Sequence, residues 1–396
     1  MTVITNKNDV TAIRPELEEA DSQGLTDFLN LSLSDMRAWF ENHGERTFRA
    51  DQVFQWIHRK RVLSFEGMTN LSKDLRQKLN ESAILRAPQI ETVQESADGT
   101  RKYQLRTYDD FMIECVFIPN ASAAGRNTLC ISSQVGCAMG CRFCATAAIK
   151  LKRNLGAGEI VAQLYTVLND LEQNGYELDK TKPHAQHVIA NLVYMGMGEP
   201  LHNVDNVIRS IRLIGADDGL NYAARRITVS TSGLVKNMLR LGEETDAQLA
   251  VSLNATTDDT RSEIMPVNRK WQIKDLLDAC RSFPLKAGRR VTFEYVMLAG
   301  INDSDEDARR LIRLMKGLKS KINLIPFNPH PLSPYERPSA ERVAVFQRLV
   351  ADAGFSVFVR TTRGDDIDAA CGMLGGEKLE GAREQELVNI SLSDAS

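Results

Sequence analysis

The chain has 396 residues, a formal net charge of −3 and 43% hydrophobic residues, which suit a globular protein with one large domain and one small one. No apolar run approaches the roughly 18 residues of a membrane span, and residues 1–26, expected to form a flexible tail, lack the features of an export signal. We therefore expect a cytoplasmic protein without a membrane partner, in which seven cysteines act as metal ligands, catalysts or core residues rather than as disulfides.

Residues 27–92 are predicted to form a small helical domain. Apolar side chains recur there at helical spacing in three short segments. Between residues 37 and 86, ten Lys and Arg residues stand against six Asp and Glu residues, and the run from His58 to Arg61 is the densest basic part. This surplus fits a solvated helix end or, alternatively, a face that contacts phosphates. Because the whole chain is nearly neutral, it would need such a local basic face to bind nucleic acid.

A β-hairpin extension is predicted for residues 93–125, because apolar and polar residues alternate on both sides of Asp109 and Asp110, which we place at the turn. Residues 126–365 then alternate between short β-branched runs and amphipathic helical segments. Six such units in series predict an α/β fold in which a parallel sheet curls into a partial or full barrel. The expected strands are residues 128–133, 188–195, 226–231, 248–253, 290–298 and 321–327.

Polar residues follow the predicted strands at the points where the strands end. In α/β barrels the active site forms at the carboxyl ends of the strands, so these side chains are expected to meet at one mouth. They are Ser132 with a cysteine loop, Gly196 to Glu199, Ser230 and Ser232, Ser252 and Asn254, and Asn328.

The cysteine loop carries three thiols as Cys137-x-x-x-Cys141-x-x-Cys144. Three thiolates can hold a 4Fe-4S cluster and leave one iron open to an outside molecule. A structural zinc site is the alternative, but such sites usually take four ligands in two short pairs, and the chain has no second pair of that kind.

The cysteine loop, with Phe143 before its last cysteine, resembles the signature of the radical S-adenosylmethionine (SAM) enzymes. The chain from about residue 30 to residue 375 further resembles the RlmN family of adenine-C2 methyltransferases of 23S ribosomal RNA and transfer RNA. It departs from that family's pattern at Asn254, where histidine is common, and at Phe327, where tryptophan is common. The segments that carry the resemblance are YMGMGEPLHN, VSTSGLV, AVSLNA, EYVMLAGIND, INLIPFNPHP and RTTRGDDIDAACGML.

This resemblance implies a partial (β/α)6 radical SAM barrel over residues 126–365, one 4Fe-4S cluster per chain and two SAM molecules for each methylation. Cys137, Cys141 and Cys144 would hold the cluster. The residues implied to bind SAM are Gly198, Glu199, Ser230, Ser252, Leu253, Asn254 and Asn328.

The resemblance also implies a route to carbon 2 of adenine, which is electron-poor and has no lone pair to attack a methyl cation. Cys371, in the C-terminal segment 366–396, would take a methyl group from one SAM; a radical made from a second SAM would turn that methyl group into a carbon radical that adds to adenine. Release would need a proton acceptor, matched by Glu114, and a second thiol, matched by Cys130, which forms a transient disulfide. The sequence leaves open which of these two residues removes the proton.

Under this interpretation the partners are 23S ribosomal RNA and transfer RNA, with an electron donor such as flavodoxin, and the chain is expected to act as a monomer. The helical domain, with Lys150, Lys152 and Arg153, becomes the candidate RNA contact. The target base must leave its stack to reach the barrel.

Three alternatives remain open. A related resistance methyltransferase acts on carbon 8 of adenine and shares the cluster and both cysteines. Methylthio transfer to RNA normally needs another cluster, and the four cysteines outside the loop stand singly. A non-catalytic, metal-stabilised RNA-binding protein is the alternative from a different class.

Overall fold

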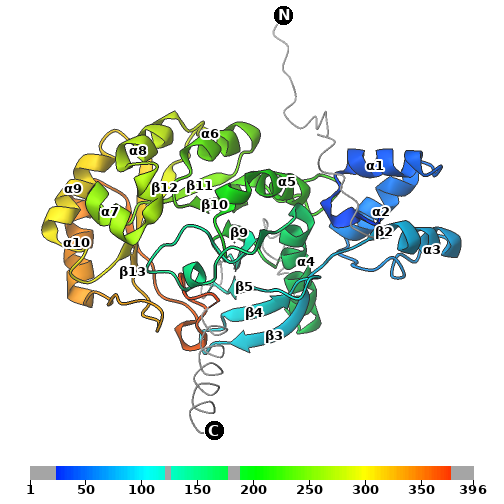
Figure 1. The fold of residues 1–396 in the computed structure, drawn as a ribbon, viewed down its shortest axis with the longest axis horizontal. Helices are drawn as coiled ribbons and strands as arrows, with labels where there is room; N and C mark the ends of the chain where they lie inside the picture. The colour runs from blue at the N-terminus through cyan, green and yellow to red at the C-terminus, as the bar shows by residue number, and fades with distance from the viewer. Residues whose placement is uncertain (1–23, 121–125, 177–187, 376–396) are drawn as a thin grey trace, which may run out of the picture.

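The computed structural model describes residues 24–120, 126–176 and 188–375. A ten-stranded sheet forms its centre, in the order β14-β13-β12-β11-β10-β9-β6-β5-β4-β3 (Figure 1). Seven neighbouring strands are parallel: β6 (Thr128–Cys130), β9 (Asn191–Tyr194), β10 (Ile227–Thr231), β11 (Gln248–Ser252), β12 (Val291–Met297), β13 (Ser320–Pro326) and β14 (Val357–Val359). Three antiparallel strands continue the sheet: β3 (Gln89–Glu95), β4 (Arg101–Arg106) and β5 (Met112–Ile118).

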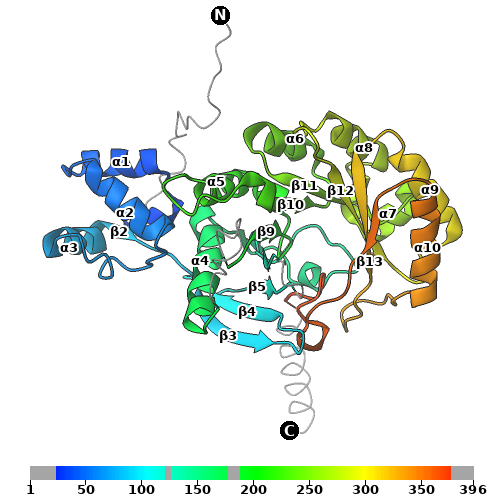
Figure 2. The ribbon, with the colours of Figure 1, turned by 180° about the vertical axis from the view of Figure 1, so that it is seen from behind.

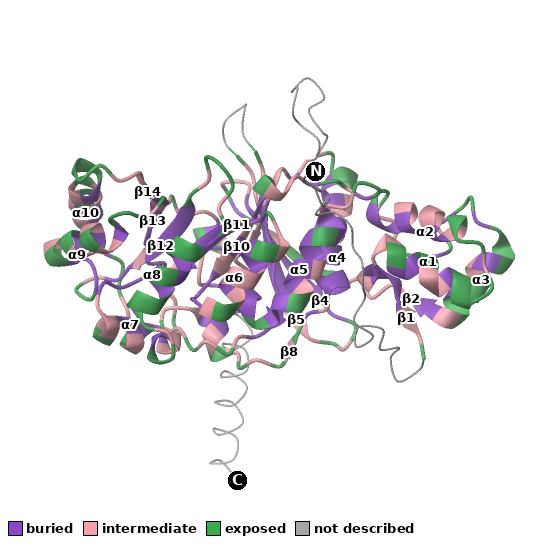
Figure 3. Ribbon diagram, turned by 90° about the horizontal axis from the view of Figure 1, so that it is seen from above, coloured by how far each residue is buried: buried purple, intermediate pink, exposed green. Residues whose placement is uncertain are grey.

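Helices follow the parallel strands and cover one face of the sheet (Figure 2). Their sequences place apolar residues at helical spacing, and these residues are buried while the opposite positions are exposed, as the purple and green faces in Figure 3 show. The helices are α4 (Ala157–Gln173), α5 (Val204–Ile214), α6 (Val235–Glu244), α7 (Asp258–Ile264), α8 (Ile273–Ser282), α9 (Asp305–Met315) and α10 (Ala340–Asp352).

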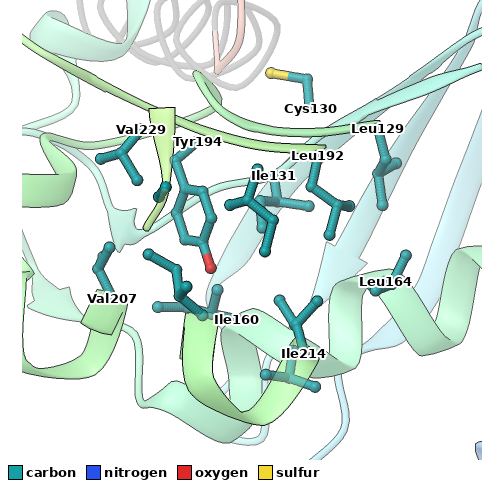
Figure 4. Close-up of a cluster of buried hydrophobic side chains, with 14 of the residues drawn as sticks. Leu129, Cys130, Ile131, Ile160, Leu164, Leu192, Tyr194, Val207, Ile214 and Val229 are labelled. Carbon is teal, nitrogen blue, oxygen red and sulfur yellow. The ribbon is translucent and has the colours of Figure 1, made fainter. Parts of the chain in front are cut away.

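The two faces of the parallel sheet differ in chemistry. On the helix-covered face, Leu129, Leu192 and Val229 are fully buried, and Figure 4 shows them packed toward α4 and α5 while Cys130 points the other way. Because neighbouring strands keep side chains in register, Cys130, opposite Val193, belongs to the inner face of the curved sheet. The same register places several polar residues on this inner face: Thr228, Ser230, Gln248, Ser252, Thr292, Glu294, Lys321 and Asn323.

The N-terminal part is helical, as predicted, and packs against the barrel through α4. Its helices are α1 (Leu33–Asn42), α2 (Phe48–His58) and α3 (Lys73–Ser82), preceded by the 3₁₀ turn η2 (Phe28–Asn30). Asn30 accepts a hydrogen bond from the Gly158 amide at 2.7 Å, and Arg209 on α5 pairs with Asp35 at 2.6 Å. These contacts fix the small domain on the outside of the barrel, at the end seen in blue in Figure 1.

The structure confirms the six predicted barrel strands and the turn at Asp110, whose φ is 63°. Within the ten-stranded sheet it adds two strands that the sequence analysis did not predict, β3 and β14. The predicted tail up to residue 23, the loop 121–125 and residues 376–396 lie outside the described residues. In the described part of the chain, no helix combines the length and the apolar character that crossing a membrane requires.

The basic segment from His58 to Arg61 is less cationic at its surface than its sequence indicates. His58 is fully buried and bonded to the Tyr165 hydroxyl at 2.9 Å, and burial lowers its pKa to about 3, so its imidazole is neutral. Arg61 forms two hydrogen bonds to Glu172. Arg59 and Lys60 therefore carry most of the exposed positive charge of this segment.

Candidate active site

The cysteine loop lies between the short strand β7 (Gln134–Val135) and the 3₁₀ turn η3 (Ala145–Ala148), beside the carboxyl ends of the parallel strands. Gly136 has a φ of 75°, and a Cβ there would stand 2.5 Å from the Lys150 carbonyl oxygen. Only glycine fits this close approach. The loop is further held by the amide of Arg142, which donates to the Ile264 carbonyl at 3.0 Å, and by His330, whose Nε2 lies 3.2 Å from the Phe143 carbonyl.

The three cysteines of the loop have the chemistry of iron–sulfur ligands. Burial raises the pKa of Cys137 to about 12 and raises the pKa values of Cys141 and Cys144, and each thiolate also repels at least one of the others. Such thiols ionise readily only when a metal takes their charge. In the described residues, no three His, Cys, Asp or Glu side chains converge as ligands of a single metal ion, so the fit to a cluster rests on the all-sulfur donor set and on its partial burial.

Glu199 lies beside the loop, and its charge acts on Cys137 and Cys141. Its carboxylate accepts hydrogen bonds from the amides of Ser232 at 2.7 Å and Leu201 at 3.0 Å, and burial nevertheless raises its pKa. The preceding residue must be glycine, because Gly198 has a φ of 99° and a Cβ there would lie 2.6 Å from a side-chain carbon of Gln134. The turn thus fixes a buried carboxylate beside the cysteine loop.

Arg261 on α7 is a fully buried cation that the sequence analysis did not predict. Its guanidinium donates to three main-chain carbonyls, those of Ser232, Ser252 and Leu253, and to the side chain of Asn268, at 2.7 to 3.0 Å. Burial lowers its pKa to about 10, and the charge of Cys141 acts in the opposite direction. Arg261 therefore joins the ends of β10 and β11 and places a positive charge near the cysteine loop.

Cys130 and Cys371 lie near enough for their charges to interact, although 240 residues stand between them in the chain. Burial raises the pKa of Cys130 to about 12, and the nearby Cys371 charge is the next cause. Main-chain contacts position Cys371: Asn328 donates to its carbonyl at 3.2 Å, and Ala145 donates to the carbonyl of Gly372 at 2.7 Å. The C-terminal segment, red in Figure 1, therefore runs between the end of β13 and the cysteine loop.

Glu114 is buried on β5 and also contacts the C-terminal segment, because its Oε2 accepts a hydrogen bond from the Gly375 amide at 2.8 Å. Val116, two residues along the strand, lies opposite Cys130. Side chains at alternate positions share a face, so Glu114 and Cys130 lie on the same side of the sheet.

The remaining predicted SAM contacts divide into two groups. Ser230 and Ser252 lie on the inner face of the sheet. Asn254 and Asn328 form hydrogen bonds within the protein. The Asn254 side chain accepts from the Val296 amide at 2.8 Å, and the Asn328 side chain accepts from Arg337 at 2.7 Å. Asn254 has a φ of 56°, a conformation that asparagine tolerates better than most residues. Leu253 is fully buried and contributes its main chain to this region.

Arg153 does not support the RNA contact that the sequence predicted for it. Its guanidinium bonds to Asp109 and Glu159 at 2.6 to 2.8 Å, and these carboxylates raise its pKa further against the effect of burial. Lys150 and Lys152 are exposed. Of the three cations after the cysteine loop, these two stay available to a phosphate.

Sequence reasoning did not identify Gln134, Arg261, Glu294 or Arg360 as residues of this region. Gln134 accepts the Glu199 amide at 2.8 Å, and the charges of Glu294 and Arg360 both act on Cys130. For Glu294 a signal was available, because it lies inside a predicted strand, and a strand buried on both faces is expected to be apolar.

Comparison with known proteins agrees with this architecture. A family model described as the radical SAM superfamily matches residues 131–312. The crystal structure of a radical SAM methyltransferase from Sphaerobacter thermophilus is similar over 88% of this chain and 99% of that one, with a TM-score of 0.82 and 41% identity. The fold and the cysteine loop thus define the class: the chain is a radical SAM protein, and this class uses SAM and a 4Fe-4S cluster.

Residues 26–85 match a second family model, the ribosomal RNA large subunit methyltransferase N-terminal domain. The dual-specificity RNA methyltransferase RlmN of Geobacter sulfurreducens is 45% identical over 376 residues, which cover 94% of this chain and 99% of that protein. The RlmN 2 protein of Myxococcus xanthus is 48% identical over 353 residues, which cover 88% and 90%. The chain belongs to the RlmN family.

Proposed function

We propose that this protein methylates carbon 2 of adenine in 23S ribosomal RNA, in the peptidyl-transferase region, and in transfer RNA, next to the anticodon. The observation that carries the proposal is that Cys130, on the inner side of the sheet, and Cys371, held beside the cysteine loop by Asn328, lie near enough for their charges to interact. A methyl group attached to Cys371 would stand between the source of the radical and a base that enters the barrel mouth. Two distant thiols brought together in this way suit a route that ends in a disulfide.

In this proposal Cys137, Cys141 and Cys144 hold one 4Fe-4S cluster per chain, and two SAM molecules are used for each methyl group transferred. When bound, the cluster supplies the electron that cleaves SAM to a radical. Gly198 and Glu199 receive the amino group of SAM. The side chains of Ser230 and Ser252 and the segment through Leu253 and Asn254 line its site, while Asn328 holds Cys371 in position through its carbonyl.

In this proposal, proton removal and product release take place on the same side of the sheet. Glu114 is the proposed proton acceptor, because a buried carboxylate on the face of Cys130 can reach a base held there. One electron would return from the adduct radical to the bound cluster. Cys130 would then attack the sulfur of Cys371: the disulfide bond forms, the bond from that sulfur to the former methyl carbon breaks, and this carbon takes a proton to become the methyl group of the released adenine. The high pKa of Cys130, about 12, means that its thiol keeps its proton until that step and favours Glu114 as the acceptor.

RNA binding is assigned to exposed cations on two surfaces: Arg59 and Lys60 of the helical domain, and Lys150 and Lys152 after the cysteine loop. Lys60 also lies 3.5 Å from the ring centre of Trp56. Phosphate contacts of this kind give affinity, and the folded shape of the RNA gives selectivity. The protein acts as a monomer and takes its electron from a donor such as flavodoxin.

The position of the new methyl group tests the proposal. Ribosomal and transfer RNA from cells with and without the protein would be digested to nucleosides, and 2-methyladenosine separated from 8-methyladenosine by mass spectrometry. We expect 2-methyladenosine only in the presence of the protein. A methyl group at carbon 8 would show that the protein has the activity of the related resistance methyltransferase. The absence of any methylated adenosine would support the non-catalytic alternative.

A further inference from the structure

The inner face of the sheet carries an exposed aromatic ring at its edge. Phe358, the middle residue of β14, is 56% exposed. It lies opposite Asn323 of β13, so its ring is on the inner face. The residues on either side of it lie opposite Ile322 and Leu324, which are fully buried on the helix-covered face. Because β14 ends the ten-stranded sheet, no further strand of the described chain covers this side of the ring.

Three cations lie along the same edge. Lys321 is on the inner face of β13, opposite Thr292, and Lys319 comes two residues earlier. Arg290 precedes β12 and donates to the Ser356 hydroxyl at 2.9 Å. Lys319 and Arg290 are exposed and Lys321 is half-buried. No ion pair of these three side chains is found among the described residues, so their charges are available to an anion.

A groove of about 580 Å³ opens at the amino ends of these strands. Ser356 lines it and lies on the same side of β14 as Phe358, because the two residues are two positions apart. Lys286 pairs with the Asp246 carboxylate at 3.2 Å, which leaves a surplus of positive charge in the groove. The cations that line the groove are Lys286, Arg289, Arg290 and Lys319.

The other end of β14 leads to the proposed site of reaction. The amide of Arg360 bonds to β13 at 2.8 Å, so Arg360 continues the strand and shares the inner face with Phe358. The Thr362 hydroxyl then donates to Asn328, the residue that holds the carbonyl of Cys371. The chain from Phe358 to Thr362 spans at most about 14 Å. One RNA strand can therefore contact Phe358 while its target base lies near Cys371.

We propose that the inner edge, formed by Phe358, Lys321, Lys319 and Arg290, binds the unpaired RNA strand beside the target adenine, with one nucleobase stacked on Phe358 and phosphates against the cations. This surface rests on the proposed function, which brings an RNA strand to the barrel. A base that enters the barrel has left its stack. The neighbouring base thereby loses a stacking partner, and an exposed aromatic ring replaces that partner for any base. Cations along the edge contact phosphates without reading sequence.

The affinity of the anaerobic, iron-loaded protein for two synthetic RNAs tests the stacking contact. One RNA is a hairpin with an adenine in its unpaired loop, the other is a fully paired duplex of the same length, and fluorescence anisotropy measures binding. We expect Phe358→Ala to weaken binding of the hairpin on the order of tenfold, as the loss of one stacked base does, and to leave binding of the duplex unchanged. Phe358→Leu should behave like Phe358→Ala, because it keeps an apolar side chain without a ring, whereas Phe358→Trp should bind like the wild type.

Val93→Ala is the matched control, because it shortens an exposed apolar side chain on β3, the strand at the opposite edge of the sheet. It should change neither affinity. The inner edge is rejected if the wild type does not bind the hairpin, if Phe358→Ala binds it as the wild type does, or if that variant weakens hairpin and duplex equally. If Phe358→Ala loses its iron or melts at a lower temperature, Phe358→Trp decides. Its added fluorescence should be quenched by the hairpin, and an unchanged signal contradicts stacking.

The salt dependence of hairpin binding tests the phosphate contacts. Lys319→Gln with Lys321→Gln should reduce the slope of log Kd against log salt by about 1.4, the value for two phosphates of a single strand. Arg309→Gln with Arg313→Gln removes the same charge from exposed positions of α9, on the helix-covered face, and should leave the slope unchanged. A wild-type slope in the lysine variant would contradict the phosphate contacts.

Neither binding assay depends on methylation. A wild-type protein that methylates no RNA, while Phe358→Ala weakens binding of the hairpin alone, would reject the proposed function and keep the inner edge. Methylation by the wild type with unchanged affinity in every variant would reject only the inner edge.

Discussion

At the scale of single residues, the thiols were predictable and the charges around them were not. The spacing of Cys137, Cys141 and Cys144 predicts a ligand loop without any knowledge of the fold, because the loop is local. Arg261 and Arg360 gave no such signal, since an arginine in a helix or after a strand is usually exposed. Arg261 is buried and Arg360 faces inward only because strands that are distant in the sequence pack together.

Cys371→Ala is expected to abolish RNA methylation while leaving the iron content unchanged, because Cys371 is not among the proposed cluster ligands. Methylated nucleosides and bound iron would be measured on the same preparation. Cys280→Ala is the control, as Cys280 is buried in α8. Full methylation by Cys371→Ala would exclude the methylcysteine route.

Cys130→Ala should instead trap the reaction before release, because no thiol remains to attack Cys371. The expected result is a protein covalently joined to RNA, visible as a band of reduced mobility in a denaturing gel that ribonuclease removes. Adding Cys371→Ala to this variant should eliminate the band. Free methylated product in normal amount would contradict the role of Cys130.

Arg261→Met should lower the free energy of unfolding by about 3 to 5 kcal/mol, because it leaves three buried carbonyls and Asn268 without their donor. Chemical denaturation would measure the loss. Arg281→Met, on the exposed surface and paired with Asp278, should change stability by less than about 1 kcal/mol. Equal effects would show that the buried network adds no stability.

Asp27 gives the small domain a predictable response to pH. Burial raises its pKa from 3.8 to about 6 against two main-chain hydrogen bonds that lower it. Between these values the folded state binds more protons than the unfolded state, so this residue's stabilising contribution is present below about pH 4 and is lost as the pH rises through 6. Relative to wild type, Asp27→Asn should gain on the order of 2 kcal/mol between pH 4 and pH 8, and a flat difference would contradict the assignment.

At the scale of elements, the six barrel strands were predictable from their β-branched runs, whereas β3 and β14 were not. In β14 only Val357 to Val359 pair, and Phe358 between them is exposed, so no alternation distinguishes them from a loop. β3 is almost wholly exposed, and a pattern of burial was what the sequence analysis sought. Both strands form because an adjacent strand of the sheet offers hydrogen bonds, and this is a tertiary effect.

Gly158 tests how the helical domain is attached. A Cβ at this position would lie 2.6 Å from the Leu29 side chain, so Gly158→Val should push η2 away from α4 and break the Asn30 bond. Limited proteolysis should then cut faster near residues 85–88. Gln173→Val, at the exposed end of the same helix, is the matched control, and equal digestion rates would contradict this mode of attachment.

At the scale of the whole molecule, the proposed function needs a charged surface as well as the barrel. If Arg59 and Lys60 contact phosphates, replacing both by Gln should weaken RNA binding and reduce the slope of log Kd against log salt by roughly two. Lys274→Gln with Arg281→Gln, on the far helix α8, removes the same charge and should leave the slope unchanged. A slope unaffected by the first pair would move the RNA contact elsewhere.

The continuous sheet has an open edge that bears on self-association. Because β3 ends the sheet on one side, it leaves a row of main-chain donors and acceptors open, together with partly exposed Ile90 and Val93. A second chain can form hydrogen bonds with such an edge and add a strand to the sheet. Here an irregularity in the pairing between Ile90 and Thr92 and the carboxylates of Glu91 and Glu95 interrupt the edge, so the strand that completes the sheet also protects it from growing further.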